Sequence, residues 1–162
     1  MSGPPRLSAL ELIELVPDPG SWQSWDTQLA EFAVDADYRA ELNEARRRSG
    51  IDEAALTGSA RIHGRQVAAM VGEFTFLGGS IGLAAAVRLT TAIDRATRER
   101  LPLLAAPASG GTRVQEGPWA FLQMANITRA ITEHSSAGLP YLVFCVTPRL
   151  GAFSRPGRRW DT

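Results

Sequence analysis

The sequence predicts a single α/β domain whose central strands run parallel and whose ligand site lies at one edge of the sheet. Two patterns support this: short apolar segments alternate with amphipathic helical segments, and glycine pairs follow two of the apolar segments. The composition agrees, because 162 residues that are 44% hydrophobic and 21% charged are typical of a globular protein with a buried core. Continuous apolar strands separated by helices favour parallel pairing with right-handed crossovers.

The first 55 residues are expected to form a helical N-terminal arm rather than a packed domain. Residues 7–16, "LSALELIELV", predict a short helix that Pro17 stops. The segment "GSWQSWD" indicates a turn, and residues 37–48 predict a polar helix that ends at Ser49-Gly50. Apolar positions in this part are too few for a core of its own, so it serves as an arm or cap.

Residues 56–146 carry the alternation of strands and helices. The segments "GSARIHG" and "RQVAAMVGEFTF" predict two strands joined by a tight turn at His63-Gly64. Ser80 is expected to cap a helix over residues 81–98, whose apolar face is rich in alanine. The segment "LLAAPA" then predicts a short buried strand.

A second helix is expected to start near Pro118 and to end at Gly138, before the apolar strand "LPYLVFCV". The two glycine-rich turns, Gly78-Gly79 and Gly110-Gly111, each follow the carboxyl end of a predicted strand. In an open α/β sheet this is the edge where ligands bind.

Paired glycines before a helix leave backbone N–H groups uncovered, and such groups hold either a phosphate or the negative oxygen of a reaction intermediate. Gly110-Gly111 could equally be only a tight connection between a strand and a helix. The phosphate interpretation is the weaker one, because the chain contains no lysine and no GxxxxGK[ST] segment.

Side-chain chemistry at these turns is sparse. Ser109 would need a nearby base to act as a nucleophile, and His63 and His134 are expected to be structural. Cys145 is expected in the core, and Glu116 is expected to serve a helix N-terminus. The residues therefore favour chemistry in which backbone N–H groups stabilise an oxyanion and the substrate or cofactor supplies the rest.

Composition also excludes several classes of protein. Seventeen basic residues balance seventeen acidic ones, which gives no global field for nucleic acid or an anionic membrane. One cysteine excludes an internal disulfide framework and a cysteine zinc site. Glu11 and Glu14 interrupt the apolar N-terminal segment, which does not fit a signal peptide, and a cytoplasmic protein is expected.

Three segments, "FTFLGGSIG", "ERLPLLAAPASGGTRVQEG" and "AGLPYLVF", resemble the carboxyltransferase beta subunit of acetyl-CoA carboxylase and its acyl-CoA carboxylase and malonate decarboxylase relatives. The likeness runs from Thr57 to Val146, and "PGSWQSWD" is similar to the initial segment of the acyl-CoA branch. The resemblance implies a crotonase-like fold, a spiral of ββα units, which would be incomplete in this chain.

The resemblance also implies an activity, the transfer of a carboxyl group from carboxybiotin to the α-carbon of an acyl-CoA, which gives malonyl-CoA or a homologue for fatty acid biosynthesis. By the resemblance, Gly110 and Gly111 form the backbone oxyanion hole, while Gly78, Gly79 and Ser80 contact the CoA. A shaping role falls to the remaining residues of the motif, which are Arg113, Gln115 and Glu116. A hydratase of the same fold is disfavoured, because no suitably placed pair of glutamates is visible.

The resemblance implies partners as well. A second carboxyltransferase domain or alpha-type subunit would supply the biotin pocket, a biotin carboxyl carrier would bring the biotin, and a biotin carboxylase would load it. The intact assembly is expected to be an oligomer that uses acyl-CoA as substrate and no metal, and that binds neither nucleic acid nor membrane.

The last segment, residues 147–162, is expected to be a non-native and disordered tail. It contains two prolines and a cluster of basic side chains, Arg149, Arg155, Arg158 and Arg159. Codons can be chosen so that one nucleotide sequence encodes this tail in one reading frame. The same nucleotides, read in a shifted frame, encode the usual continuation of the family. The hypothesis is a single-base insertion or deletion near codon 146, which makes a truncated, inactive fragment the alternative to a working carboxyltransferase component. Gene sequencing tests it, and the hypothesis fails if the shifted frame does not encode the remainder.

Overall fold

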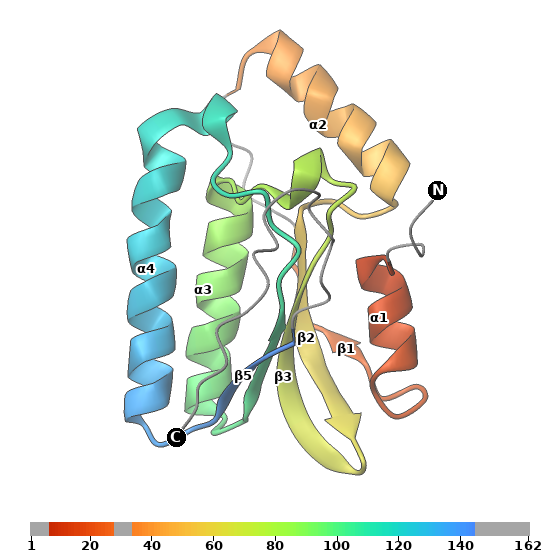
Figure 1. The fold of residues 1–162 in the computed structure, drawn as a ribbon, viewed down its shortest axis with the longest axis vertical. Helices are drawn as coiled ribbons and strands as arrows, with labels where there is room; N and C mark the ends of the chain where they lie inside the picture. The colour runs from red at the N-terminus through yellow and green to blue at the C-terminus, as the bar shows by residue number, and fades with distance from the viewer. Residues whose placement is uncertain (1–6, 28–33, 145–162) are drawn as a thin grey trace, which may run out of the picture.

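The computed structural model describes residues 7–27 and 34–144, and in them a five-stranded sheet with strand order β1-β2-β3-β4-β5 (Figure 1). The strands are β1 (Gln23–Ser24), β2 (Ala55–Ile62), β3 (Arg65–Gly72), β4 (Leu103–Ala106) and β5 (Tyr141–Val143). The α-helices are α1 (Ala9–Leu15), α2 (Ala36–Ser49), α3 (Leu83–Arg98) and α4 (Gly117–Ser136), and two short 3₁₀ turns are η1 (Leu77–Gly79) and η2 (Val114–Glu116). The predicted α/β fold is confirmed.

The hairpin of β2 and β3 forms at the predicted position. The two strands pair antiparallel up to Ile62 and Arg65, and the turn residues His63 and Gly64 have φ angles of 50° and 76°. Positive φ at both central residues matches the right-handed twist of the strands. The carboxylate of Asp18 accepts hydrogen bonds from both turn N–H groups, at 2.9 and 2.7 Å, and so ties the segment after α1 to the hairpin.

Parallel pairing follows the hairpin, as the alternating pattern predicts. Strand β4 pairs parallel with both β3 and β5, so Leu103 lies between Ala68 and Tyr141. Helices α3 and α4 lie side by side on one face of these strands (Figure 1). Half of the eight buried residues in the core cluster between them are alanine, which lets the helices approach the sheet: Ala68, Met70, Ile93, Ala96, Leu101, Leu103, Ala105 and Ala130.

The N-terminal segment contains the two helices expected there. Ser8 caps α1 in a reciprocal capping box with Glu11, and Gly50 ends α2 with a left-handed backbone at φ 73°. The "GSWQSWD" segment differs from the expected turn, because β1 pairs antiparallel with β2. Gly58 permits this approach, since a Cβ there would lie 2.5 Å from the carbonyl oxygen of Gln23.

The cap of α3 also differs from the prediction. Gly82, rather than Ser80, is its N-cap and makes no side-chain hydrogen bond there. The reason is tertiary: Ile81 forms a parallel bridge with Thr112, which holds the chain extended until Gly82.

Two further predictions concern the limits of the domain. The division into an arm of residues 1–55 and a domain of residues 56–146 stays a prediction. Cys145 and the expected tail of residues 147–162 lie outside the described residues. Within the described ranges, no helix is long and apolar enough to cross a membrane.

Candidate oxyanion site

The two glycine turns, which are distant in sequence, lie against each other at the carboxyl edge of β3 and β4. The Gly110 N–H donates to the carbonyl oxygen of Gly78 at 2.9 Å. The Ile81 N–H donates to the Gly111 carbonyl at 2.9 Å, and the Arg113 N–H donates to the Ile81 carbonyl at 3.0 Å. A short ladder of backbone hydrogen bonds therefore fixes the spacing of the turns.

Two of these glycines are required by the backbone for different reasons. Gly79 has a φ of 69°, and a Cβ there would lie 1.7 Å from the carbonyl oxygen of Ala108, so only glycine fits. Gly111 has a φ of 112°, which side chains rarely adopt, but a Cβ there would have nothing within 4 Å. The first glycine allows the turns to touch, and the second leaves an open backbone surface.

The structure shows where the N–H groups of the expected oxyanion hole point. The Gly111 N–H donates to the Ser109 hydroxyl at 3.1 Å, and the Gly110 N–H donates to Gly78 as described above. A substrate oxygen at this site would replace these acceptors. The Ser109 hydroxyl belongs to an exposed side chain and can rotate away, whereas the Gly78 carbonyl is held by the backbone. The Gly111 N–H is thus the more accessible donor.

A buried guanidinium lies behind the turns. The side chain of Arg113 is 1% exposed and donates to both carboxylate oxygens of Glu53, one of them at 3.1 Å. It also donates to the Ser80 carbonyl at 2.8 Å and to the Tyr38 hydroxyl and a Glu116 oxygen, both at 3.3 Å. One side chain therefore connects both glycine turns to α2 and to the segment before β2.

The charge states in this cluster follow from its contacts. Burial alone would lower the pKa of Arg113, but the hydrogen bond and negative charge of Glu53 raise it above its usual range. Burial, followed by the hydrogen bond to Glu116, raises the pKa of Tyr38 well above its usual range. The guanidinium is therefore cationic and the phenol neutral across the physiological range.

Glu116 serves a helix N-terminus, as expected, but the helix is α3. One of its carboxylate oxygens accepts from the Leu83 N–H at the start of α3, and the other accepts from the Tyr38 hydroxyl at 2.5 Å. Gly82 makes room for this contact, since a Cβ there would lie 2.4 Å from the Glu116 carboxylate. The neighbouring Gln115 donates to Glu41 of α2 at 3.0 Å. These contacts agree with the shaping role expected for the motif.

Sequence reasoning missed Tyr38 and Glu53. A signal existed for Tyr38, which is the single aromatic residue in the polar segment "DYRAELNEARRR" and is 5% exposed. No local pattern distinguishes Glu53 from a surface carboxylate, because its partner Arg113 is 60 positions away.

The histidines and Ser109 have no shared site. His134 is fully buried and places Nδ1 2.9 Å from the Thr97 hydroxyl and Nε2 3.3 Å from the Pro140 carbonyl, so it joins α4 to α3 and β5. His63 lies in the hairpin turn. Among residues 7–27 and 34–144, Ser109 Oγ has hydrogen bonds only to Gly111, and no group of three or more His, Cys, Asp or Glu side chains could hold a metal ion.

A cleft of about 610 Å³ opens beside the first glycine turn. Its walls come from α2, from the segment between β3 and η1, and from η1 itself, and they include Glu41, Arg48, Thr75, Leu77 and Gly78. An extended ligand that reaches the turns has room along this cleft.

Known proteins are similar to this chain in sequence. The family model for the carboxyl transferase domain matches residues 5–155. A probable biotin-dependent acyl-coenzyme A carboxylase beta3 subunit of Mycobacterium tuberculosis is 52% identical over 146 residues, which cover 90% of this chain and 30% of the relative. Acetyl-coenzyme A carboxylase carboxyl transferase subunit beta 1 of a Roseiflexus species is 41% identical and is covered to 50% of its length.

Solved structures agree with the sequence comparison. Transcarboxylase 12S, solved with methylmalonyl-coenzyme A and methylmalonic acid bound, matches 86% of this chain with a TM-score of 0.66 and 25% identity, over 26% of its own length. The beta subunit of geranyl-CoA carboxylase from P. aeruginosa matches 85% of this chain and 24% of its own, with a TM-score of 0.65 and 18% identity. The crotonase-like fold of these domains is confirmed for this chain.

The class of protein is an α/β domain in which two glycine turns lie against each other at the carboxyl edge of the parallel strands. The chain belongs to the carboxyl transferase domain family. It spans about a third to a half of the length of the curated relatives named above.

Proposed function

We propose that this chain forms the acyl-CoA side of a biotin-dependent carboxyltransferase that makes malonyl-CoA or a homologue for fatty acid biosynthesis. The observation that carries the proposal is the contact between the two glycine turns, with the Gly110 N–H 2.9 Å from the Gly78 oxygen. This contact brings two segments of the carboxyltransferase motif together at one sheet edge, and these segments hold the five candidate residues Gly78, Gly79, Ser80, Gly110 and Gly111. Carboxylation of an acyl-CoA needs such a backbone site, because its α-carbon is activated through a negatively charged thioester oxygen.

The chain's own part in the reaction is to hold that oxygen. When the α-carbon loses its proton, charge moves onto the thioester oxygen, which the Gly111 N–H, and the Gly110 N–H once it leaves Gly78, would stabilise. Carboxybiotin on a partner protein supplies the carboxyl group: the α-carbon gains it, and the biotin nitrogen gains the proton in its place. The charge at the oxygen develops during the reaction, so these donors act more strongly on the transition state than on the bound substrate.

The CoA arm is proposed to pass Gly78, Gly79 and Ser80 and to continue in the cleft between α2 and η1. The cleft includes Gly78 in its wall and has a volume that admits an extended ligand. Arg113 donates to the Ser80 carbonyl at 2.8 Å and to the Ser80 hydroxyl at 3.4 Å. These hydrogen bonds hold one side of the turn in place, and the ligand is proposed to lie along the opposite side.

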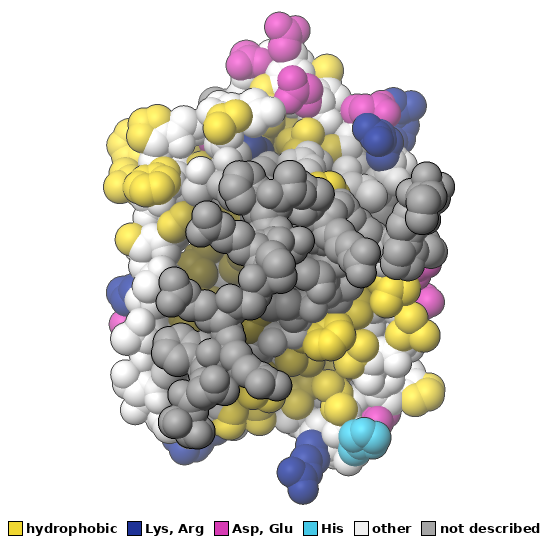
Figure 2. Space-filling view, in the orientation of Figure 1, with side chains coloured by type: hydrophobic (Ala, Val, Ile, Leu, Met, Phe, Trp, Pro, Cys, Tyr) yellow, Lys and Arg dark blue, Asp and Glu magenta, His cyan; other side chains and the backbone are white. Residues whose placement is uncertain are grey.

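Partner proteins are proposed to cover the apolar surface at the start of α4. Figure 2 shows hydrophobic side chains gathered at this end of the molecule, and the exposed large ones near it are Val114, Trp119, Phe121 and Leu122. Exposed aromatic and aliphatic side chains beside a site are typical of a protein interface. The proposed partners are the second carboxyltransferase domain or alpha-type subunit and the biotin carboxyl carrier. A cytoplasmic location is part of the proposal, and cell fractionation of the tagged protein tests it.

Reconstitution tests the proposal. The purified chain is combined with acetyl-CoA, the carboxylated biotin carrier and the partner subunit, and labelled malonyl-CoA is measured. In this assembly Gly111→Ala is expected to reduce transfer by about 10²–10³-fold, the typical cost of losing one oxyanion donor. Alanine keeps the backbone N–H but disfavours a φ of 112°, so the N–H turns away from the substrate oxygen, while acyl-CoA binding changes little.

Gly138→Ala is the matched control. Gly138 also has a positive φ, of 74°, and a Cβ there would also have nothing within 4 Å, but it lies at the far end of α4. An equal loss of binding and transfer in Gly111→Ala would contradict the assignment. If the wild-type chain gives no transfer while a full-length relative is active in parallel, the truncated and inactive alternative is favoured.

A further inference from the structure

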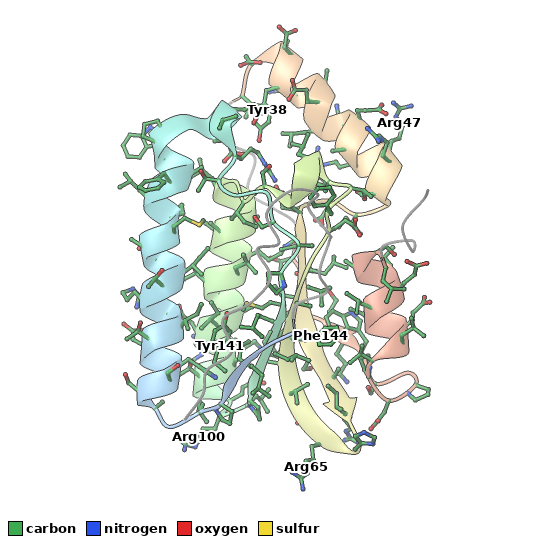
Figure 3. All side chains as sticks on the ribbon, in the orientation of Figure 1. Tyr38, Arg47, Arg65, Arg100, Tyr141 and Phe144 are labelled. Carbon is green, nitrogen blue, oxygen red and sulfur yellow. The ribbon has the colours of Figure 1, made fainter. Side chains whose placement is uncertain are left out.

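The buried cluster around Arg113 joins four segments that are far apart in the sequence. Tyr38 belongs to α2, Glu53 precedes β2, Ser80 is in the first glycine turn, and Glu116 follows the second. Figure 3 shows Tyr38 at the upper end of the molecule, between α2 and the turn that leads into α4. Every polar contact of the Tyr38 hydroxyl in the described residues is to this cluster.

Within the cluster, Arg113 contacts the first glycine turn, and Glu53 holds Arg113 in place. Arg113 donates to the Ser80 carbonyl and hydroxyl with its guanidinium and to the Ile81 carbonyl with its backbone N–H, so it makes three hydrogen bonds to the first turn and the residue that follows it. Glu53 holds the guanidinium through two oxygens, and neither group is more than 3% exposed in its side chain. A bidentate pair fixes the orientation of the guanidinium plane as well as its position.

Tyr38 adds a second constraint. Its hydroxyl donates to Glu116 at 2.5 Å and accepts from Arg113 at 3.3 Å. The same Glu116 carboxylate accepts from the first N–H of α3. The phenol therefore couples the guanidinium to the start of α3, which begins directly after the first glycine turn.

We propose that Tyr38 and Glu53 are positioning residues, which act through Arg113 to set the distance between the two glycine turns and thus the direction of the Gly110 and Gly111 N–H groups. In the described residues, the side-chain hydrogen bonds of Tyr38 and Glu53 go to Arg113, Glu116 and the Ala54 N–H, and to none of the glycines of the turns. The inference rests on the proposed function, because the N–H groups need this alignment only if they form an oxyanion site. The alignment itself can be measured without any activity.

Amide hydrogen exchange of the whole chain, followed by NMR, measures this alignment. Tyr38→Phe removes one hydroxyl and keeps the ring. It is expected to speed exchange of the Ile81 and Arg113 amides, which bridge the turns, by about tenfold, while amides of the β2–β3 hairpin keep their rates. Tyr141→Phe is the matched control, since Tyr141 is a half-buried tyrosine on β5 outside the cluster.

A second pair of variants separates positioning from general stability. Glu53 and Glu73 are both 2% exposed, but the Glu73 carboxylate accepts from the backbone N–H groups of Ala9 and Thr75 rather than from Arg113. Glu53→Gln is expected to speed exchange at the bridging amides by about tenfold or more, because the guanidinium loses the negative charge of its bidentate partner. Glu73→Gln is expected to leave these two amides at wild-type rates relative to the hairpin.

The outcomes decide the proposal. Faster exchange confined to the bridging amides in Tyr38→Phe and Glu53→Gln supports it. Unchanged bridging amides overturn it, and so does an equal rise at every amide, which would mean a purely structural role. Titration with acetyl-CoA completes the test: wild type that does not bind acetyl-CoA counts against the proposed function, while the exchange pattern still decides the positioning role.

Discussion

Gly79 and Gly50 have nearly the same left-handed backbone, with φ angles of 69° and 73°, but their surroundings differ. A Cβ at Gly79 would collide with the Ala108 carbonyl at 1.7 Å, whereas a Cβ at Gly50 would meet nothing within 4 Å. The pair therefore separates the cost of backbone strain from the cost of a steric clash between the two turns.

Gly79→Ala is expected to lower the free energy of unfolding by about 2–4 kcal/mol, because strain and overpacking add. Gly50→Ala is expected to cost only about 1–2 kcal/mol, the strain alone. Urea denaturation of the two variants measures the difference. Equal losses would mean that the turns are not in contact in solution.

The raised pKa of Tyr38 predicts that the free energy of unfolding decreases at alkaline pH. Because its pKa is raised in the folded state, the unfolded chain loses this proton first, near the ordinary tyrosine value of about 10. The contribution is complete below that pH and is lost as the pH rises further. Urea denaturation at pH values on both sides of this point is expected to show a decrease in stability that is smaller in Tyr38→Phe.

Tyr141→Phe is the comparison for this experiment, because burial also raises the pKa of Tyr141. Each variant should remove its own share of the decrease, with the larger share from Tyr38. A wild-type pH profile in Tyr38→Phe would contradict the buried, neutral phenol.

At the scale of elements, Arg88 connects α3 to the chain that enters β2. Its guanidinium donates to both oxygens of Asp52 at 2.8 and 2.6 Å and to the Ala55 carbonyl at 3.0 Å, and its Nε lies 3.3 Å from Asp26. Asp26 in turn accepts from the Thr57 hydroxyl at 2.7 Å. The side chain of Arg88 is 4% exposed, so this helix is fixed to β1 and β2 by a buried ion pair as well as by apolar packing.

Arg88→Met is expected to cost about 2–3 kcal/mol of unfolding free energy, since the partly buried Asp26 and the half-exposed Asp52 lose their cation. Arg129→Met is the control, because Arg129 pairs with Glu133 on the exposed face of α4 and should cost less than about 0.5 kcal/mol. Thermal and urea unfolding compare the two. A loss in Arg88→Met as small as that of the control would show that the pair contributes no net stability.

At the scale of the whole molecule, the two faces of the sheet are covered unequally. Helices α3 and α4 cover one face, and the short α1 covers part of the other (Figure 1). An apolar cavity of about 130 Å³ remains beside α1, with Leu12, Val16, Val71 and Phe144 in its walls. Strand β5 is at the edge of the described sheet, and Leu142, Val143 and Phe144 are about half exposed. Such an edge favours association with other chains.

The isolated chain is therefore expected to self-associate with increasing concentration, as followed by sedimentation velocity. Val143→Lys on β5 should shift the equilibrium towards monomer, because a charge on an edge strand opposes pairing. Val87→Lys on α3 is the matched control, since Val87 and Val143 have similar exposures of 53% and 49%. A monodisperse monomer with a cooperative melt would refute the prediction for the wild type.

What the sequence alone determined is the local part of the description. The order of strands and helices from β2 to β5, the hairpin at His63-Gly64 and the glycine turns after β3 and β4 follow from hydrophobic periodicity and turn chemistry, which neighbouring residues encode. The family likewise follows from contiguous motifs, because segments such as "APASGGTRVQEG" are read without knowledge of any contact.

Only the tertiary structure decided how these parts act on one another. It showed that the Gly110 N–H already has an acceptor in Gly78, that Glu116 caps α3, and that Ile81 pairing with Thr112 moves the cap of α3 from Ser80 to Gly82. The cluster that connects Arg113 to Tyr38 spans 75 positions. Contacts at such separations depend on how the strands and helices pack, and a local sequence pattern carries no record of that packing.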